Sequence, residues 1–311
     1  MMTRFTLSLM IAIFGGTLLF SAACAKEQTN ASAQETTTTS NVTSQTLPPS
    51  LNTDWRELDL ENTLYITTKY GVFVVEMAPE FAPNHVAQIK ILARQKFYDD
   101  ITFHRVIDGF MNQTGDPKGD GTGDSQLPDI DAEFTFRRPT KMTMTTVARQ
   151  MFDGGVEATG FYKSYPIASK PISQAILTKD GKVEAWGVHC PGTLSMARGP
   201  ESINSANSQF FLMRGESTSL NQLYSIWGMT VWGREHLTKI NVGTFGKDPG
   251  FIPDMMLTVR VAADVPTAEI IPVQVMKTDS QAFKSYVDSL KSPTGKPAKV
   301  CDITVPSRLK P

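Results

Sequence analysis

The sequence is poor in metal-binding side chains and in net charge. It has three cysteines and four histidines among 311 residues, and its formal charge is −1. His85, His104 and His236 show no spacing typical of metal ligands, so we expect neither a metal nor any other cofactor. A charge this close to zero gives no global electrostatic reason to expect nucleic acid as a partner.

The glycine-rich segment 115–123 lacks the residues that would make it a phosphate or calcium site. No Gly-Lys-Ser/Thr follows it, as in a phosphate loop, and Leu127 stands where a twelve-residue calcium loop needs its closing glutamate. We therefore interpret this segment as a tight loop without a ligand.

The N-terminus is typical of an exported protein. Arg4 precedes an apolar run from Phe5 to Phe20, which is short for a membrane span and ends in small residues. The residues before Cys24 are similar to a bacterial lipobox, although Ser21 stands where leucine is usual. We expect residues 1–24 to be a signal peptide, with lipid on Cys24 holding the protein to a membrane in the periplasm. The alternative is ordinary cleavage after Ala25, which gives a soluble periplasmic protein.

Residues 25–58 are predicted to be a disordered tether. Threonine, serine, glutamine and asparagine dominate 27–50, which has almost no apolar content. Such a segment cannot offset the entropy of ordering its backbone. The folded part is therefore expected to follow this Ser/Thr-rich stretch.

Cys190 and Cys301 remain as an even pair if Cys24 carries lipid. Export to an oxidising compartment permits a disulfide between them. Two separate buried thiols are the alternative, and the sequence does not decide between the two.

Many short apolar segments predict a mainly β protein. Strands are expected at 64–68, 72–76 and 255–262, among others, whereas only two or three segments have helical spacing. Ser280 is a suitable N-cap for one such helix. This pattern favours a closed antiparallel barrel over a parallel sheet. Residues 136–186 are rich in turn signals and are interpreted as an insertion that carries some strand.

The segment from Phe103 to Gly115 places an arginine in an apolar row. On strand alternation, Ile101, Phe103, Arg105 and Ile107 share one face. A guanidinium cannot be neutralised and must find acceptors. Arg105 therefore either pairs with an internal carboxylate or is available to a ligand.

The segment 208–213 is predicted to be a strand with two different apolar faces. Phe210 and Leu212 point one way, toward the core, and Gln209, Phe211 and Met213 point the other way. A face with glutamine, phenylalanine and methionine is not a solvated face. It indicates the wall of a binding site.

Several motifs together resemble the cyclophilin peptidyl-prolyl isomerases in order and spacing. They are Phe103-His104-Arg105-Val106-Ile107, Gly109-Phe110-Met111 with Gln113, Gly121-Thr122-Gly123, Leu194-Ser195-Met196-Ala197 and Ser208-Gln209-Phe210-Phe211. The match covers roughly 64–133 and 189–242. It implies a closed eight-stranded antiparallel barrel with a helix over each end. The cyclophilin-like domain would span 59–265, with the insertion inside it and a C-terminal α/β extension, 266–311, packed on the barrel.

The resemblance also implies the site residues. Arg105 matches the family's catalytic arginine, Gln113 matches a glutamine that bonds the substrate backbone, and Phe110 is assigned with them to catalysis. The remaining matches are expected to bind substrate: Met111, Ala197, Arg198, Gln209, Phe211, Leu220 and Tyr224. Ser219 departs from the family, which commonly carries tryptophan there, and Asp108 replaces a common proline.

The implied reaction is the rotation of an X-Pro amide, which breaks no bond and needs no nucleophile or metal. We expect a monomer that acts on proline-containing polypeptides of the periplasm and touches a membrane only through a lipid anchor. The rival interpretation is a cyclophilin-like peptide-binding module or chaperone with little turnover. A thiol enzyme using His189 and Cys190 is disfavoured, because adjacent strand residues face opposite ways.

Overall fold

The computed structural model describes residues 50–152 and 155–311. The predicted signal peptide, Cys24 and most of the predicted tether lie outside these residues. Within the described part of the chain, none of the helices has the length and apolar character needed to cross a membrane.

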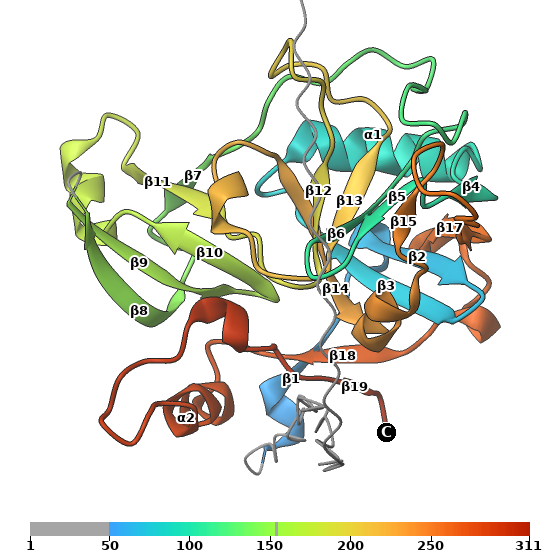
Figure 1. Ribbon diagram of the computed structural model, residues 1–311. Coiled ribbons are helices and arrows are strands. Elements are labelled where there is room, and N and C mark those ends of the chain that lie inside the picture. Colours follow the sequence, from blue (N-terminus) through green and yellow to red (C-terminus); the bar gives the residue numbers. More distant parts are fainter. Residues whose placement is uncertain (1–49, 153–154) are drawn as a thin grey trace, which may run out of the picture. The chain divides into compact units, whose positions relative to one another are not determined.

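A curled nine-stranded antiparallel sheet forms the centre of the protein (Figure 1). Its strands, in spatial order, are β15 (Gly243–Thr244), β5 (Arg105–Ile107), β6 (Met111–Thr114), β13 (Phe210–Met213), β12 (Thr193–Met196), β14 (Ile226–Trp232), β3 (Gly71–Met77), β2 (Thr63–Thr68) and β17 (Thr258–Val261). Val259 of β17 pairs with Ile66 of β2, 193 residues away in sequence, so the sheet is fixed by long-range pairing.

The concave side of this sheet holds one of the two large apolar cores to which the sheet contributes. Helix α1 (Pro83–Arg94) covers it and buries Val86, Ile89 and Leu92 against strand residues such as Phe210 and Leu212. Pro83 stands in the first turn of α1, where its missing N–H costs nothing. The 3₁₀ helix η5 (Arg234–Lys239) adds Leu237 to the same core.

The sheet does not close into the predicted eight-stranded barrel. Its edge strands β15 and β17 do not pair with each other. A separate two-stranded ladder, β4 (Ile101–Thr102) with β16 (Met255–Met256), lies in the segments that lead into β5 and β17. The strands are interrupted between these short pieces, at Phe103-His104 and at a bend at Leu257, so the structure has a nine-stranded half-barrel beside a short ladder.

The insertion predicted for residues 136–186 forms a five-stranded antiparallel sheet of its own, whose second strand in spatial order ends at Gly187. The order is β7 (Phe136–Pro139), β11 (Lys182–Gly187), β10 (Tyr165–Ser169), β9 (Gly155–Tyr162) and β8 (Thr145–Phe152). In Figure 1 this yellow-green sheet lies to one side of the central sheet.

The C-terminal residues form a three-stranded sheet with the start of the folded chain. Its order is β1 (Trp55–Glu57), β18 (Val273–Met276) and β19 (Ser307–Leu309). The predicted tether boundary at residue 58 is therefore wrong, because Trp55 is buried and pairs with Met276. Composition gave no signal for this pairing, since the partner strand lies 220 residues further along the chain.

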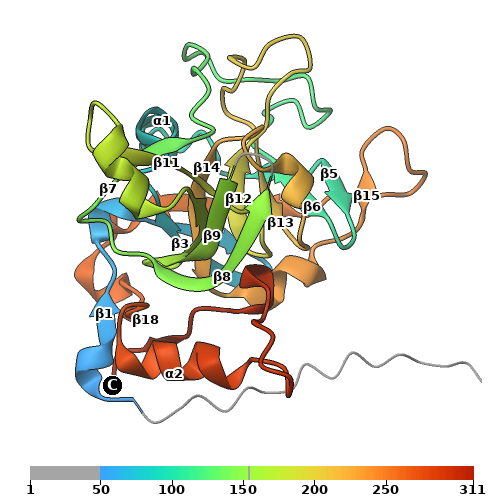
Figure 2. The same ribbon diagram turned by 90° about the vertical axis from the view of Figure 1, so that its left-hand side faces the viewer.

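Helix α2 (Gln281–Ser289) begins after Ser280, whose hydroxyl accepts a hydrogen bond from the N–H of Phe283, as predicted. It does not cap an end of the barrel. Instead Phe283 packs edge-on against Phe161 of β9, with ring centroids 5.5 Å apart, and α2 lies beneath β8 and β9 in Figure 2. A second core thus joins α2, the insertion and the convex side of β2, β3 and β14.

Candidate active site

One transverse row of side chains crosses the convex face of five strands and organises the candidate site. The pairing register places Thr244 opposite Arg105, Arg105 opposite Gln113, Gln113 opposite Phe211 and Phe211 opposite Ser195. Directly opposed residues in a sheet point to the same face. Side chains from β5, β6, β12, β13 and β15, which are separated in the sequence, thereby lie in one row.

Arg105 belongs to this convex row and not to the apolar row predicted for it. Ile101 and Phe103 are buried in the concave core, but so is Val106, while Arg105 is half-buried on the other face. The strand is interrupted between β4 and β5, and the interruption reverses the alternation. The described residues offer Arg105 no carboxylate within 4 Å, so its charge is not neutralised by an internal ion pair.

Two glutamines orient Arg105 through a chain of hydrogen bonds. Nη1 of Arg105 donates to Oε1 of Gln113 at 3.1 Å, and Nε2 of Gln113 donates to Oε1 of Gln209 at 3.0 Å. Gln209 in turn donates to the carbonyls of Gly121 and Gly123, at 3.2 and 2.9 Å. The glycine-rich loop 115–123, interpreted from the sequence as a tight loop without a ligand, therefore serves to fix Gln209. Most donors of Arg105 remain available.

Beside this polar chain lies a small apolar cluster, which we call the outer-face cluster. Its buried members are Met111, Phe211 and Met213, and its half-buried members are Phe110, Ala197, Leu220 and Tyr224. It is separate from the two large cores. Six of these seven residues are those that the resemblance assigns to the site. Met213 is the seventh member and was not assigned to the site. It alternates with Gln209 and Phe211 on one face of the strand, and this pattern could have predicted its place in the cluster.

The edge of the site is formed by Ala197, Arg198 and Tyr224. The N–H of Ala197 donates to the carbonyl of Gln209, so this donor is engaged within the protein rather than free for a peptide. The guanidinium of Arg198 lies 4.8 Å from the ring centroid of Tyr224, and its Nε donates to the carbonyl of Leu223. Tyr224 packs edge-on against Phe211, with centroids 5.6 Å apart. The whole edge is thus braced by aromatic contacts.

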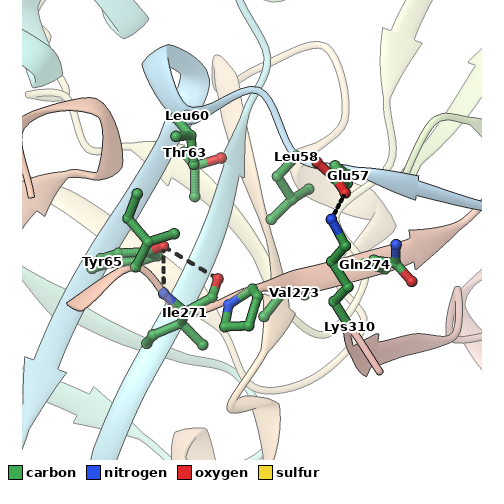
Figure 3. A pocket seen from close by; sticks show the side chains of 11 residues that line it. Glu57, Leu58, Leu60, Thr63, Tyr65, Ile271, Val273, Gln274 and Lys310 are labelled. Carbon is green, nitrogen blue, oxygen red and sulfur yellow. Dashed lines mark hydrogen bonds and ion pairs between the residues drawn. The ribbon is translucent and has the colours of Figure 1, made fainter. Parts of the chain in front are cut away.

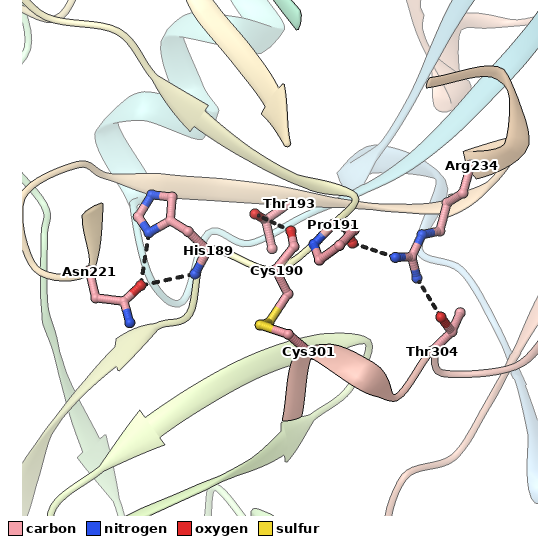
Figure 4. Close-up of a disulfide and its surroundings, with 8 residues drawn as sticks. All are labelled: His189, Cys190, Pro191, Thr193, Asn221, Arg234, Cys301 and Thr304. Atoms are coloured by element: carbon pink, nitrogen blue, oxygen red, sulfur yellow. Dashed lines mark hydrogen bonds between the residues drawn. A yellow bond between two sulfur atoms is a disulfide. The ribbon is translucent and has the colours of Figure 1, made fainter. Parts of the chain in front are cut away.

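His189 packs against the outer-face cluster. It was not assigned to the site from the sequence. Its ring stacks on Phe211, with an angle of 19° between the planes. Its backbone N–H and Nδ1 both lie about 3 Å from Oδ1 of Asn221 (Figure 4). Nε2 lies 2.9 Å from Oγ of Ser195. Because Asn221 Oδ1 is an acceptor, Nδ1 carries the proton and Nε2 accepts from Ser195. Burial lowers the pKa of His189 to about 4, so the ring is neutral at pH 7.

A disulfide joins Cys190, the neighbour of His189, to Cys301 (Figure 4). The sequence had left open whether these thiols pair. Arg234 adds a second link at this point, since its guanidinium donates to the carbonyl of Pro191 and to Oγ1 of Thr304. The C-terminal extension is therefore tied to the turn that carries His189.

A cavity of about 160 Å³ lies elsewhere, between β2, the end of β1 and the C-terminal extension (Figure 3). Its walls include Leu58, Leu60 and Ile271, and the ion pair of Glu57 with Lys310 lies beside it. The hydroxyl of Tyr65 is already paired with the backbone of Ile271. No residue assigned to the site from the sequence lines this cavity.

The described residues contain no cluster of three or more side chains that could hold a metal ion. The convex face presents the guanidinium of Arg105, which has no carboxylate partner among the described residues, beside a fixed amide chain and an apolar cluster. Such a surface can bind an apolar ring and donate a hydrogen bond to an adjacent atom. It offers no activated nucleophile to that atom.

Comparisons with known proteins agree with this chemistry. Residues 63–261 match the family model described as cyclophilin type peptidyl-prolyl cis-trans isomerase/CLD. A probable peptidyl-prolyl cis-trans isomerase of Brucella suis is 32% identical over 218 residues, which cover 66% of this chain and 85% of that protein. Peptidyl-prolyl cis-trans isomerase B of Bacillus subtilis is 56% identical over 48 residues, or 15% of this chain and 34% of its own. The crystal structure of cyclophilin AquaCyp293 from Hirschia baltica has a TM-score of 0.71 and 34% identity, covering 82% of this chain and 93% of its own.

Proposed function

Because this chain belongs to the cyclophilin-type peptidyl-prolyl cis-trans isomerase family, we propose that its convex face isomerises X-Pro bonds in extracytoplasmic polypeptides and so assists their folding. The supporting observation is the position of Arg105, which lies beside the outer-face cluster and has no carboxylate partner among the described residues. Arg105, Gln113 and Phe110 are assigned to catalysis. The substrate-binding residues are Met111, Ala197, Arg198, Gln209, Phe211, Leu220 and Tyr224.

The reaction requires the amide to leave its planar state. Rotation about the X-Pro bond has a barrier of about 18–20 kcal/mol because resonance gives that bond partial double-bond character. The planar form is charge-separated, so an apolar surface such as Phe110, Met111 and Phe211 disfavours it more than the twisted form. The proline ring would lie on this cluster.

Arg105 is placed to act on the twisted form alone. In that state the prolyl nitrogen regains a lone pair, which the planar amide does not have, and a guanidinium N–H can donate to it. A donor that binds only the transition state raises the rate, and Gln113 holds it in place beforehand. A charge-assisted hydrogen bond worth about 1.5–3 kcal/mol corresponds to roughly ten- to hundredfold.

The alternative function is a peptide-binding module or chaperone that binds extended chains with little turnover. Ser219 motivates it, because this exposed serine stands where the family commonly carries an aromatic residue that would extend the apolar surface. A protease-coupled assay on a proline tetrapeptide distinguishes the two. Turnover supports the isomerase, whereas binding of the peptide without acceleration supports the module.

We further propose that the protein is exported and attached to a membrane by lipid on Cys24, after removal of a signal peptide. The Cys190–Cys301 disulfide supports export, because such bonds persist in oxidising compartments. Cleavage after Ala25 is the alternative and would leave a soluble protein. Mass spectrometry of the mature N-terminus decides between them, since only the first route leaves a diacylglycerol on Cys24.

The fold itself supports one finer proposal, that the barrel is closed in solution through the β4–β16 ladder. The N–H of Phe103 donates to the carbonyl of Asp254, and the N–H of Leu257 donates to that of Thr67, which ties the ladder to the segment before β5 and to β2. Slow amide exchange at Phe103 and Leu257 is expected for a closed barrel. Exchange as fast as in an exposed loop would contradict closure.

A further inference from the structure

We infer that Arg214 is a positioning residue for the isomerase reaction, because it holds the turn that presents Phe110. This inference rests on the proposed function of the outer-face cluster. Arg214 follows Met213 directly at the end of β13, and nothing in the sequence motifs assigns it a role.

The guanidinium of Arg214 connects the Phe110 turn with two other segments. Nη2 donates to Oδ1 of Asp108 at 2.8 Å and to the carbonyl of Thr238 at 3.1 Å. Nη1 donates to Oδ1 of Asn112 at 3.1 Å and to the carbonyl of Ile240 at 3.0 Å. The side chain of Arg214 is only 3% exposed, whereas that of Asp108 is 75% exposed. A buried arginine with four acceptors has a fixed geometry, so it can define the position of Asp108.

The backbone of the same residue holds Phe110 itself. The N–H of Arg214 donates to the carbonyl of Phe110 at 2.8 Å, and the N–H of Gly215 donates to it at 3.3 Å. A Cβ on Gly215 would lie 1.9 Å from the carbonyl oxygen of Gly109, so this close approach requires glycine. Residues 214–215 therefore contact the turn 107–110 along its length.

This arrangement explains how the turn 107–110 is held in one conformation although it contains no proline. Asp108 stands where the family commonly has proline, whose ring would fix φ. Gly109, next in the chain, has a φ of +64°, a region that glycine reaches at no steric cost. Neither residue restricts the turn by itself. Instead, the ion pair between Asp108 and Arg214 restricts the turn. The ring of Phe110 is thereby held against Met111 and Met213.

The test compares Arg214→Met with a matched ion pair away from the site. Arg260 forms a bidentate pair with Asp99, at 2.7 and 2.8 Å, on the edge strand β17. Steady-state kinetics on an Ala-Ala-Pro-Phe anilide give kcat and KM for each variant at a temperature where circular dichroism shows it folded. We expect Arg214→Met to raise KM by about tenfold and to lower kcat as well, since a displaced Phe110 no longer binds the proline ring and no longer adds to the apolar surface that favours the twisted amide. Arg260→Met should leave KM unchanged, and Arg214→Lys should restore part of the loss.

The split between kcat and KM separates positioning from simple stability. A variant that only unfolds more readily loses active enzyme, which lowers the apparent kcat and leaves KM as it was. That outcome for Arg214→Met, or an equal rise of KM in Arg260→Met, would overturn the inference. If the wild-type protein binds the peptide without turnover, the proposed function fails instead, and the Kd of the same peptide then tests the positioning of Phe110.

Discussion

The two faces of strand β13 differ in how many side chains support each residue. Phe210 and Leu212 point into the concave core, where they join two dozen buried side chains from the sheet, α1 and η5. Phe211 and Met213 point outward into a cluster of only seven residues, bordered by Arg105 and two glutamines. One strand of four residues thus serves stability with one face and chemistry with the other. We therefore expect substitutions on the concave face to lower stability and substitutions on the convex face to lower activity.

The largest effect is expected from truncation on the concave face. Phe210 is fully buried and packs edge-on against Tyr98 and Trp227. We expect Phe210→Ala to lower the free energy of unfolding by about 3–5 kcal/mol, through lost burial and the cavity left behind. Urea denaturation measures this. The KM of the remaining folded enzyme should not change, and a raised KM would show that the two faces are coupled.

Loss of the disulfide is expected to have the next largest effect. Cys190 and Cys301 are 111 residues apart, so their bond restricts much of the unfolded chain. We expect Cys301→Ser to lower the free energy of unfolding by about 2–5 kcal/mol. Urea denaturation of the variant, beside the wild type with and without a dithiol, measures this. A variant as stable as the oxidised wild type would show that the bond contributes nothing.

A smaller and pH-dependent effect is expected from His189. Its pKa falls from an ordinary value of 6.5 to about 4 on folding, because burial disfavours the charged ring. The unfolded chain then binds the proton more readily. The contribution of this pKa shift to the free energy of unfolding is complete above pH 6.5 and is lost as the pH falls from 6.5 toward 4. It amounts to about 3 kcal/mol.

His189→Gln is the comparison for this measurement, because glutamine does not titrate. The difference in unfolding free energy between the wild type and His189→Gln should shrink as the pH falls from 7 to 4. A difference that stays constant over this range would contradict the assignment of a buried neutral ring beside Phe211.

The same contrast explains what the sequence could predict. Alternation separated Phe210 and Leu212 from Phe211 and Met213 correctly, because β13 is short and unbroken. Alternation failed at Arg105, because the strand breaks at Phe103-His104 and the parity changes. Local patterns also could not show that β1 pairs with β18 or that Cys190 meets Cys301, since these contacts depend on how distant segments pack. His189 and Arg214 were missed for the same reason: the contacts of His189 with Phe211 and of Arg214 with Asp108 exist only once separate segments have packed together.

In the proposed reaction, Arg105 binds the twisted amide and not the ground state. The most direct measurement is the kcat/KM of Arg105→Ala and of Arg105→Lys on a proline tetrapeptide, with the fold of each verified by circular dichroism. We expect a loss of at least tenfold in Arg105→Ala, with unchanged peptide affinity. Full turnover in a folded Arg105→Ala would contradict it.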